Sequence, residues 1–381
     1  MTDEAALLQD VRVVDLSRVL AGPYAASILA ELGADVIKVE SPSGDPARSI
    51  GPFVDGRSLY FASVNAGKRG VVLDLQEEQG RAHLHQLLQT ADIVIENFLP
   101  AVGRKLGVTP SELLSQHPQL VIVSISGYAR GTDAEDRPVL DLVVQAESGI
   151  MSVTGEPDRP PVRAGVPIGD LAAGLWGVIA TLGGLNARNR DGNGRHLEVP
   201  LFDATLGMLS YMATAALTQD EDPPRVGSGH HSVVPYGAYP TTDGWMVIAV
   251  IGDRFFPPLC EALGLNDLIE DGTLATNASR TQHRARIDDA IARATSTRTT
   301  RTLSGLLDAA GVPHAPVRGL IDALTSPYTT GRGLVESLDA DPPYTVVRGP
   351  LNTAPTARRP APELGQHTTA VLREIDRPEP G

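Results

Sequence analysis

Only one cysteine, Cys260, occurs in the 381 residues, which excludes an intrachain disulfide framework. A single thiol is typical of a reducing compartment, so we expect a cytoplasmic protein. Charged residues make up 20% of the sequence, aromatic residues make up 4%, and the net charge is −14. Phosphate neutralisation needs Lys and Arg, so an acidic chain is unsuited to nonspecific nucleic-acid binding. We expect no nucleic-acid partner.

Long hydrophobic runs and targeting signals are also missing. Apolar-rich runs such as LAAGLWGVIATLGGL are shorter than the roughly 18 residues of a membrane span, and they are rich in Gly and Ala. The opening MTDEAALLQD is acidic and has no basic region followed by an apolar one. We expect neither a signal peptide nor a membrane partner.

The short signatures of several chemistries are absent. The turn after the first predicted strand reads SRVLAGPYAA, so the dinucleotide fingerprint fails. The sequence has no HExxH, paired CxxC, P-loop or G-x-S-x-G. His230 and His231 are adjacent, and His83 and His85 are two apart on a predicted helix, so neither pair shares a face. We expect no bound metal.

The first half of the chain has the pattern of a parallel α/β sheet. Hydrophobic spacing predicts a strand at 11–14, a helix at 25–32 and a strand at 34–39, which is a β-α-β unit. Further strands are predicted at 71–75, 93–96 and 121–126, and helices at 79–89, 101–106, 110–116, 141–151 and 171–188. The sequence NRDGNG at 189–194 is interpreted as a hairpin turn. Together these elements predict a Rossmann-like domain.

A polar, Pro-rich stretch, QDEDPPRVGSGHH, separates a second region. It should contain strands within 236–251 around the turn TTDG and small helices within 254–318. The irregular, Pro-rich segment 342–364 is expected to run over a surface, against another domain or a partner subunit. We therefore predict an α/β protein with a large domain at 1–220, completed by 330–381 wrapping back, and a smaller α+β domain at 221–329.

One stretch, RAGVPIGDLAAGLWG, raises the question of chemistry. Asp170 stands ahead of an apolar helical run, where Asp is a favoured N-cap. A carboxylate at a helix N-terminus is also expected to be held ionised by the helix dipole, which would keep it nucleophilic. Gly169 removes a side chain beside it, so a bulky acyl group could approach. On this stretch alone, cap and nucleophile both remain open.

Cations gather near the predicted strand ends. They are Arg18, Lys68, Arg69, Arg104 and Lys105. Ligands of open α/β sheets lie at the carboxyl ends of the strands, where cations and helix N-termini can hold phosphates. Each residue is also compatible with a solvated surface charge. The cluster indicates an anionic ligand if the residues act together.

The chain resembles the class III CoA-transferases, which include formyl-CoA transferase, carnitine CoA-transferase and α-methylacyl-CoA racemase. The motifs that carry the resemblance run in order along nearly the whole chain. They are VVDLSRVLAGPYAASILAELGADVIKVESPSGD, NAGKRGVVLDL, ADIVIENFLP, ISGYARG, LDLVVQAESGIMSVTG, GVPIGDLAAG and LGQHT. The resemblance implies a Rossmann-like large domain, a smaller α+β domain and an interlocked homodimer.

The resemblance also implies a reaction. Asp170, beside Gly169, would move CoA from an acyl-CoA donor to a carboxylic acid through a mixed anhydride and an aspartyl-CoA thioester. No metal and no cofactor beyond the substrate coenzyme A would be needed. Carried over by position, the CoA contacts would be Val19, Leu20, Ala21, Leu73, Asn97, Phe98, Arg104, Lys105 and Leu201.

One segment narrows the substrate. GSGHHSVVPYGAYPTTDGW is similar to the corresponding part of succinyl-CoA:glutarate CoA-transferases and their bacterial relatives, which act on dicarboxylates. The resemblance implies a succinyl-CoA donor and a dicarboxylate acceptor. Arg48, Arg163 and His231 are the candidates to hold the distal carboxylate, and Arg suits it through its bidentate fork.

Two alternatives remain. The racemase members have a His before an Asp in a GHD segment, where this chain has Leu140 before Asp141. A leucine cannot exchange a proton, which favours a transferase over an isomerase. The other alternative is a CoA-binding protein without chemistry.

Overall fold

The structure is a computed structural model that describes residues 6–351 and 358–376. The chain divides into two compact units. The first combines Met1–Ser148, Ala164–Ser210 and Pro327–Gly381, and the second combines Gly149–Arg163 and Tyr211–Ser326. The domain boundaries expected at 220 and 329 stay a prediction.

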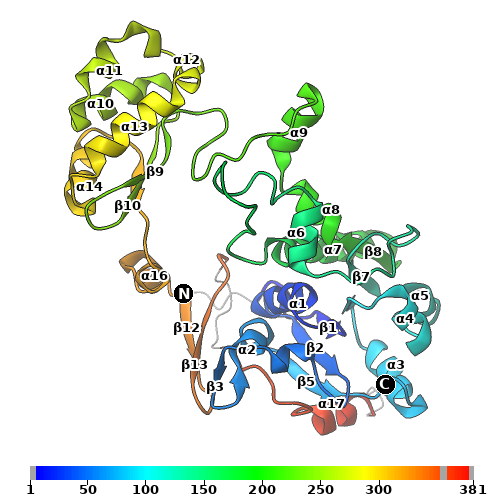
Figure 1. Ribbon diagram of the computed structural model, residues 1–381. Coiled ribbons are helices and arrows are strands. Elements are labelled where there is room, and N and C mark those ends of the chain that lie inside the picture. The colour runs from blue at the N-terminus through cyan, green and yellow to red at the C-terminus, as the bar shows by residue number, and fades with distance from the viewer. Residues whose placement is uncertain (1–5, 352–357, 377–381) are drawn as a thin grey trace. The chain divides into compact units, whose positions relative to one another are not determined.

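A parallel sheet forms the centre of the first unit (Figure 1). Among the described residues its six strands are β1 (Arg12–Asp15), β2 (Asp35–Glu40), β5 (Arg69–Val72), β6 (Ile93–Glu96), β7 (Val121–Ser126) and β8 (Arg195–Pro200). The lateral order is β5-β2-β1-β6-β7-β8, with every neighbouring pair parallel. This is the strand order of a Rossmann-like sheet, so the predicted fold of this part is confirmed.

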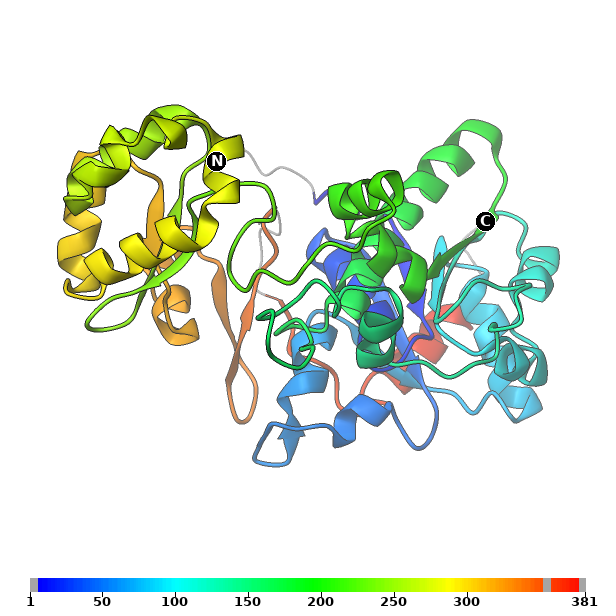
Figure 2. The same cartoon turned by 45° about the horizontal axis from the view of Figure 1, so that its top comes forward.

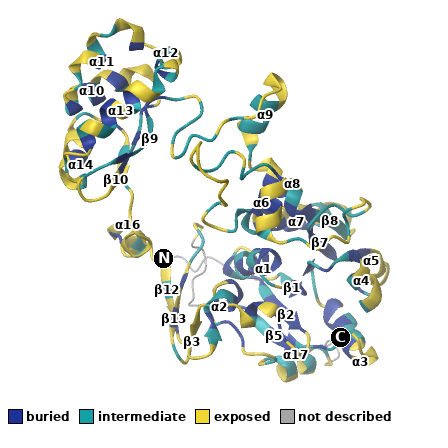
Figure 3. Cartoon of the chain, in the orientation of Figure 1, coloured by how far each residue is buried: buried dark blue, intermediate teal, exposed yellow. Residues whose placement is uncertain are grey.

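Apolar runs such as VIVSIS form these strands because both faces of the sheet are covered. Helices α1 (Ala21–Glu31) and α7 (Ile168–Asp191) pack on one face. Helices α3 (Glu78–Leu88), α5 (Pro110–Gln116) and α17 (Thr368–Ile375) pack on the other. Figure 3 shows the strands in the buried colour between these layers.

Four shorter helices of this unit lie around the sheet. They are α2 (Leu59–Asn65), α4 (Pro100–Leu106), α6 (Asp141–Glu147) and α8 (Leu201–Gly207). The predicted helices at 101–106, 110–116 and 141–151 correspond to α4, α5 and α6, although α6 ends at Glu147.

Helix α7 is rich in glycine because it packs very closely. A Cβ at Gly174 would lie 2.9 Å from the carbonyl oxygen of Ala21 in α1, and a Cβ at Gly184 would lie 2.6 Å from Val121 in β7. Gly192, at φ +75°, ends the helix. The hairpin predicted at 189–194 is therefore wrong, because β8 follows this cap and pairs in parallel with β7.

The C-terminal segment returns to the first unit. The irregular segment expected at 342–364 instead contains β13 (Tyr344–Val347), which pairs with β12 (Val335–Leu338), while 352–357 lie outside the described residues. His367 and Thr368 of the LGQHT motif then bond the open edge of β5, since their side chains accept from the N–H groups of Gly70 and Val72 at 3.0 Å. Figures 1 and 2 show the red helix α17 beside this edge.

Two short strands and one helix also belong to the first unit. They are β3 (Phe53–Val54), β4 (Arg57–Ser58) and α16 (Pro327–Gly331).

The second unit has a three-stranded antiparallel sheet in the order β11-β10-β9. The strands are β9 (Tyr236–Pro240), β10 (Trp245–Ala249) and β11 (His314–Pro316), so the strands predicted around TTDG are confirmed. The helices that follow α9 (Ser210–Gln219) are α10 (Phe256–Leu263), α11 (Asn266–Glu270), α12 (Asn277–Gln282), α13 (Arg284–Thr295), α14 (Thr300–Ala309) and α15 (Leu320–Leu324).

One helix in the part of the chain that the structure describes, α7, is long and apolar enough to cross a membrane by length and composition alone. Half of its most apolar window is buried, and a single helix of this kind is weak evidence for a membrane span.

Candidate active site

Asp170 is not the cap of its helix. The N-cap position of α7 is Pro167, and Asp170 is the third helical residue. The free N–H groups are instead capped by Asp141, whose Oδ1 accepts from Gly169 N at 2.8 Å and from Asp170 N at 3.4 Å. The cap interpretation of Asp170 is therefore wrong, and its carboxylate is left for another role.

The sequence led us to expect that Asp170 is held ionised, and this expectation is wrong. Burial, followed by the charge of Asp141, raises its pKa to about 7. The expectation failed because Asp141 occupies the N–H groups that would have stabilised the ionised form. With its pKa raised to about 7, the carboxyl group can accept or release a proton near neutral pH.

The lack of a side chain at Gly169 makes room for two neighbouring side chains. A Cβ at this position would lie 3.0 Å from Thr205 Oγ1 and 3.1 Å from Asp141 Oδ1. That Gly169 also opens the approach of an acyl group to Asp170 stays a prediction. The glycine lets Asp141 reach the start of α7.

A pocket of about 220 Å³ surrounds Asp170 within the first unit. Its lining includes six residues assigned from the sequence, namely Val19, Leu20, Ala21, Asn97, Asp170 and Leu201. The ends of β7 and the loop that follows it add Ile125–Gly127 and Arg137–Leu140. The structure thus brings together residues that are up to 183 positions apart (18 to 201) around one carboxyl group.

The turn after β1 is held tightly by side chains. Val19 has φ +69°, an uncommon conformation for a β-branched residue. Asp45 accepts from Val19 N at 3.1 Å and is paired with the buried Lys38 at 2.9 Å. Asn97 bonds both backbone groups of Arg18, at 2.9 and 2.8 Å. Asn97 therefore joins the turn after β6 to the turn after β1.

A second pocket of about 500 Å³ lies beside the first. It is lined by Leu73, Phe98 and Lys105, three further residues assigned from the sequence. Arg18 lines both pockets, and its guanidinium lies 5.7 Å from the centre of the Phe98 ring. No ion pair joins Arg18 or Lys105 to an acid among the residues described. These two cations are therefore available to an anionic ligand.

Both pockets open at the carboxyl edge of the sheet. Their walls come from the segments that follow β1 and β6, which are neighbours in the sheet and mark the point where the strand order reverses. Ligands of open α/β sheets bind at such a switch point.

Three members of the expected basic cluster do not join this site. Lys68 is fully buried and donates to Asp15, Asn65 and the carbonyl of Pro23, so its assignment to a phosphate site is wrong. Arg69 begins β5 at the opposite edge of the sheet and is paired with Asp35 and Glu374.

Arg104 lines neither pocket and is paired with Glu135 at 3.7 Å and Asp136 at 3.1 Å. Sequence spacing cannot show which cations are already neutralised.

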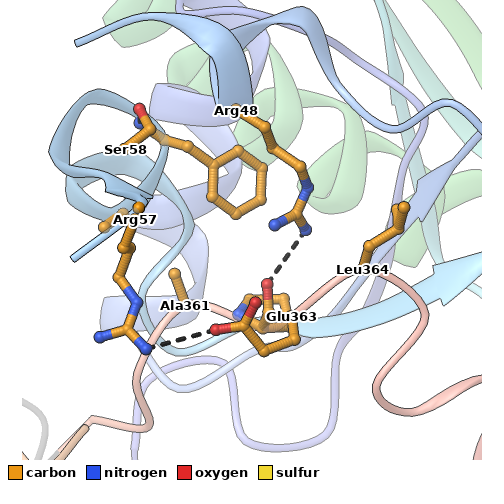
Figure 4. Close-up of a pocket in the computed structure, with 10 residues that line it drawn as sticks. Arg48, Arg57, Ser58, Ala361, Glu363 and Leu364 are labelled. Carbon is orange, nitrogen blue, oxygen red and sulfur yellow. Dashed lines mark hydrogen bonds and ion pairs between the residues drawn. The ribbon is translucent and has the colours of Figure 1, made fainter. Parts of the chain in front are cut away.

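Of the candidates for a distal carboxylate, Arg48 does not line the Asp170 pocket, and the roles of Arg163 and His231 stay predictions. Arg48 lines a different pocket, where it donates to Pro362 O (Figure 4). It also binds Glu40 in a bidentate pair at 2.7 and 2.8 Å. Arg163 and His231 belong to the second unit. His231 Nε2 lies 2.9 Å from the carbonyl oxygen of Pro224.

Sequence reasoning missed several residues of the site. Arg137 lines the Asp170 pocket and is paired with Glu147 at 2.5 Å. Tyr60, on α2, has its pKa raised to about 12 by burial and then by Asp170. Asp141 stands where the sequence comparison places the Asp of the GHD segment, after Leu140, but nothing local predicted that it caps α7.

Metal ligation was not expected from the sequence. Within 6–351 and 358–376, no group of three or more His, Cys, Asp or Glu is placed to hold a metal ion. The expectation that the reaction needs no metal stays a prediction.

The fold and the site define a class: a Rossmann-like α/β protein with an ionisable carboxyl group at the switch point and no dinucleotide fingerprint. Comparison with known proteins gives the family. The profile of CoA-transferase family III matches residues 8–368, and the chain belongs to this family. It is a CoA-transferase, and the resemblance found from its motifs is confirmed.

Similar proteins cover almost the whole chain. The succinate–glutarate CoA-transferase of Agrobacterium fabrum is 36% identical over 97% of this chain and 96% of its own. The succinyl-CoA:mesaconate CoA-transferase of Haloarcula hispanica is 35% identical over 96% of each. A crystal structure of a CaiB/BaiF family protein from Brucella suis has a TM-score of 0.86 and 35% identity, and the match covers 96% of this chain and 98% of that one.

Proposed function

We propose that Asp170 is the nucleophile that carries CoA between two carboxylic acids. The observation that supports this most is its position. It is a partly buried carboxyl group, with its pKa raised to about 7, in the pocket where the turns after β1, β6 and β7 meet. It takes no part in capping its own helix, and its partner Asp141 holds the start of α7 in place. A carboxylate so placed can act as a covalent nucleophile.

The reaction then proceeds by four exchanges at carbonyl carbons. The Asp170 carboxylate attacks the thioester, which releases CoA thiolate and leaves a mixed anhydride. The thiolate attacks the aspartyl carbonyl, which releases the donor acid and leaves an aspartyl-CoA thioester. The acceptor carboxylate attacks this thioester, and the released thiolate attacks the acceptor carbonyl of the new anhydride. Acyl-CoA and free Asp170 result.

The two pockets give a path for CoA. The phosphates would lie in the larger pocket with Lys105, and Arg18 would bridge the two pockets. The adenine or pantetheine would contact Leu73 and Phe98, and the thioester would pass Val19, Leu20 and Ala21 to reach Asp170. Asn97 and Leu201 complete the wall. Arg104 is a peripheral member at most, because Glu135 and Asp136 already neutralise it.

The substrates proposed are a succinyl-CoA donor and a dicarboxylate acceptor, in line with the names of the relatives. The test is incubation with succinyl-CoA and a panel of mono- and dicarboxylic acids, followed by mass analysis of the CoA esters. Transfer to glutarate or another dicarboxylate supports the proposal. Transfer only to monocarboxylic acids would contradict the acceptor class.

A homodimer is also proposed. One face of α7 exposes Leu175, Trp176, Ile179 and Leu182, with Trp176 at 50% and Ile179 at 55% exposure. An apolar stripe of this kind on a helix needs a covering surface. A second copy of the chain would supply it, and a monomer by light scattering at micromolar protein would contradict this.

An isomerase is the weaker alternative. Leu140 lines the Asp170 pocket and is 71% exposed, so the position of the racemase histidine is accessible but cannot exchange a proton. A cytoplasmic location and the lack of any cofactor besides CoA remain parts of this proposal.

A further inference from the structure

A polar cluster lies below the Asp170 pocket and takes no part in the chemistry described above. It is built across three neighbouring strands: Glu96 on β6 is in register with Ser124 on β7, which is in register with Glu198 on β8. Residues in register point to the same face of a sheet, so two carboxylates flank one buried serine. Such a pair repels unless a cation lies between.

Arg130, in the loop after β7, supplies that cation. Its Nη2 donates to Glu96 Oε1 at 2.6 Å and to Ser124 Oγ at 3.2 Å, and its Nε lies 3.4 Å from Glu198 Oε1. Its backbone N–H donates to both Glu198 oxygens at 3.1 Å. The other group that faces the cluster is His196, 2.8 Å from Ser124 Oγ, and burial together with Arg130 lowers its pKa to about 4. Arg130 is therefore the charge that balances the two carboxylates.

The cluster is connected to the wall of the Asp170 pocket. Glu96 Oε2 accepts from Phe98 N at 2.8 Å, and the neighbouring Asn97 binds the backbone of Arg18. On the other side, Glu198 accepts from Ser126 Oγ at 3.1 Å, and Ser126 lines the pocket. The guanidinium thus joins the turn after β6 to the ends of β7 and β8.

We propose that Arg130 is a positioning residue for CoA binding, because it bridges Glu96 and Glu198. Through this bridge it fixes the position of the turn of Asn97 and Phe98 relative to the turn of Arg18 and Val19. This inference rests on the proposed placement of CoA. Arg130 lines neither pocket, so it acts through Glu96 and Asn97 and not by touching the ligand.

The test is calorimetric binding of CoA and steady-state transfer by Arg130→Gln, Arg130→Lys and the double variant Arg130→Gln/Glu198→Gln. Arg188→Gln is the matched control. The side chain of Arg188 is 18% exposed, against 20% for Arg130, and it is also paired with an acidic residue of the first unit, Asp92. Asp92 lies at the other edge of the sheet, just before β6.

We expect Arg130→Gln to raise both the Kd of CoA and the KM of acyl-CoA about tenfold, with kcat within about threefold of wild type. Arg130→Lys should recover part of the loss. The double variant should recover most of it, since one repelling charge is gone. Arg188→Gln should change Kd by less than about twofold.

An Arg130→Gln variant that binds CoA as wild type does, an equal loss in Arg188→Gln, or no recovery in the double variant would overturn the inference. If Arg130→Gln does not fold, the double variant decides, since it should fold and bind CoA. Because binding is measured without turnover, these results are independent of whether Asp170 is the nucleophile. A wild-type chain that does not bind CoA would instead refute the proposed function, and this inference with it.

Discussion

Asp170 should make the folded protein less stable at high pH, and its replacement by Asn should remove that effect. Its pKa is raised from 3.8 to about 7 by burial and by Asp141. A shift of about three units corresponds to about 4 kcal/mol between the two protonation states. The folded state therefore binds a proton that the unfolded state releases between pH 4 and 7, and stability falls as pH rises through this window. The penalty is absent below pH 4 and complete above pH 7.

Asp170→Asn does not titrate, so the gap between variant and wild type should be close to zero at pH 4 and reach up to about 4 kcal/mol in favour of the variant at pH 8. Unfolding can be followed locally, because the chain has two tryptophans and one of them, Trp176, lies on α7. In a Trp245→Phe background, emission reports the helix that carries Asp170.

Asp203→Asn is the matched control, since it removes an exposed carboxylate from the first turn of α8. It should show no pH-dependent gain. An Asp170→Asn variant that is less stable than wild type at pH 8, or that shows the same gap at pH 4 and pH 8, would refute the assignment of a raised pKa to Asp170.

Three further predictions concern function. The pH profile of kcat/KM should have an acid limb near pH 7, set by the pKa of Asp170. Asp141→Asn should move this limb to lower pH, because the charge of Asp141 is the second cause of the raised pKa. A limb that does not move would exclude Asp141 as a cause. Lys105→Ala should weaken CoA binding about three- to tenfold at low salt and less at high salt. Arg104→Ala should have a smaller effect because the charge of Arg104 is already paired. Equal effects of the two variants would show that the phosphate site is wrongly placed. Leu140→His should not by itself give an efficient racemase, because nothing orients the new ring, and rapid α-proton exchange would contradict this.

The sequence predicts the strands of the sheet better than the turns that connect them to the helices. Strands such as 121–126 were found because apolar runs covered on both faces have no other good conformation. The turn at 189–194 was misjudged because NRDGNG suits a helix end and a hairpin equally, and only the pairing of β8 with β7 decides between them. Local sequence does not contain that information.

The site divides in the same way. The CoA contacts assigned from family motifs line two neighbouring pockets of the first unit, apart from Arg104. What failed depended on partners far away in the sequence. Lys68 is paired with Asp15, and Arg48 is paired with Glu40. Asp141 accepts hydrogen bonds from the N–H groups at the start of α7. Charge neutralisation and helix capping depend on partners that are distant in the sequence. Spacing alone therefore identifies a candidate site residue but does not show whether that residue is available to a ligand.

The central claim is that Asp170 carries CoA. The most direct measurement is chemical trapping: the wild-type enzyme is mixed with succinyl-CoA, quenched with hydroxylamine, digested and analysed by mass spectrometry, with Asp170→Asn as the control. We predict a hydroxamate at residue 170 and at no other carboxylate, and an Asp170→Asn protein that binds CoA but has lost several orders of magnitude in turnover. Trapping at another carboxylate, or near-normal transfer by Asp170→Asn, would contradict the account.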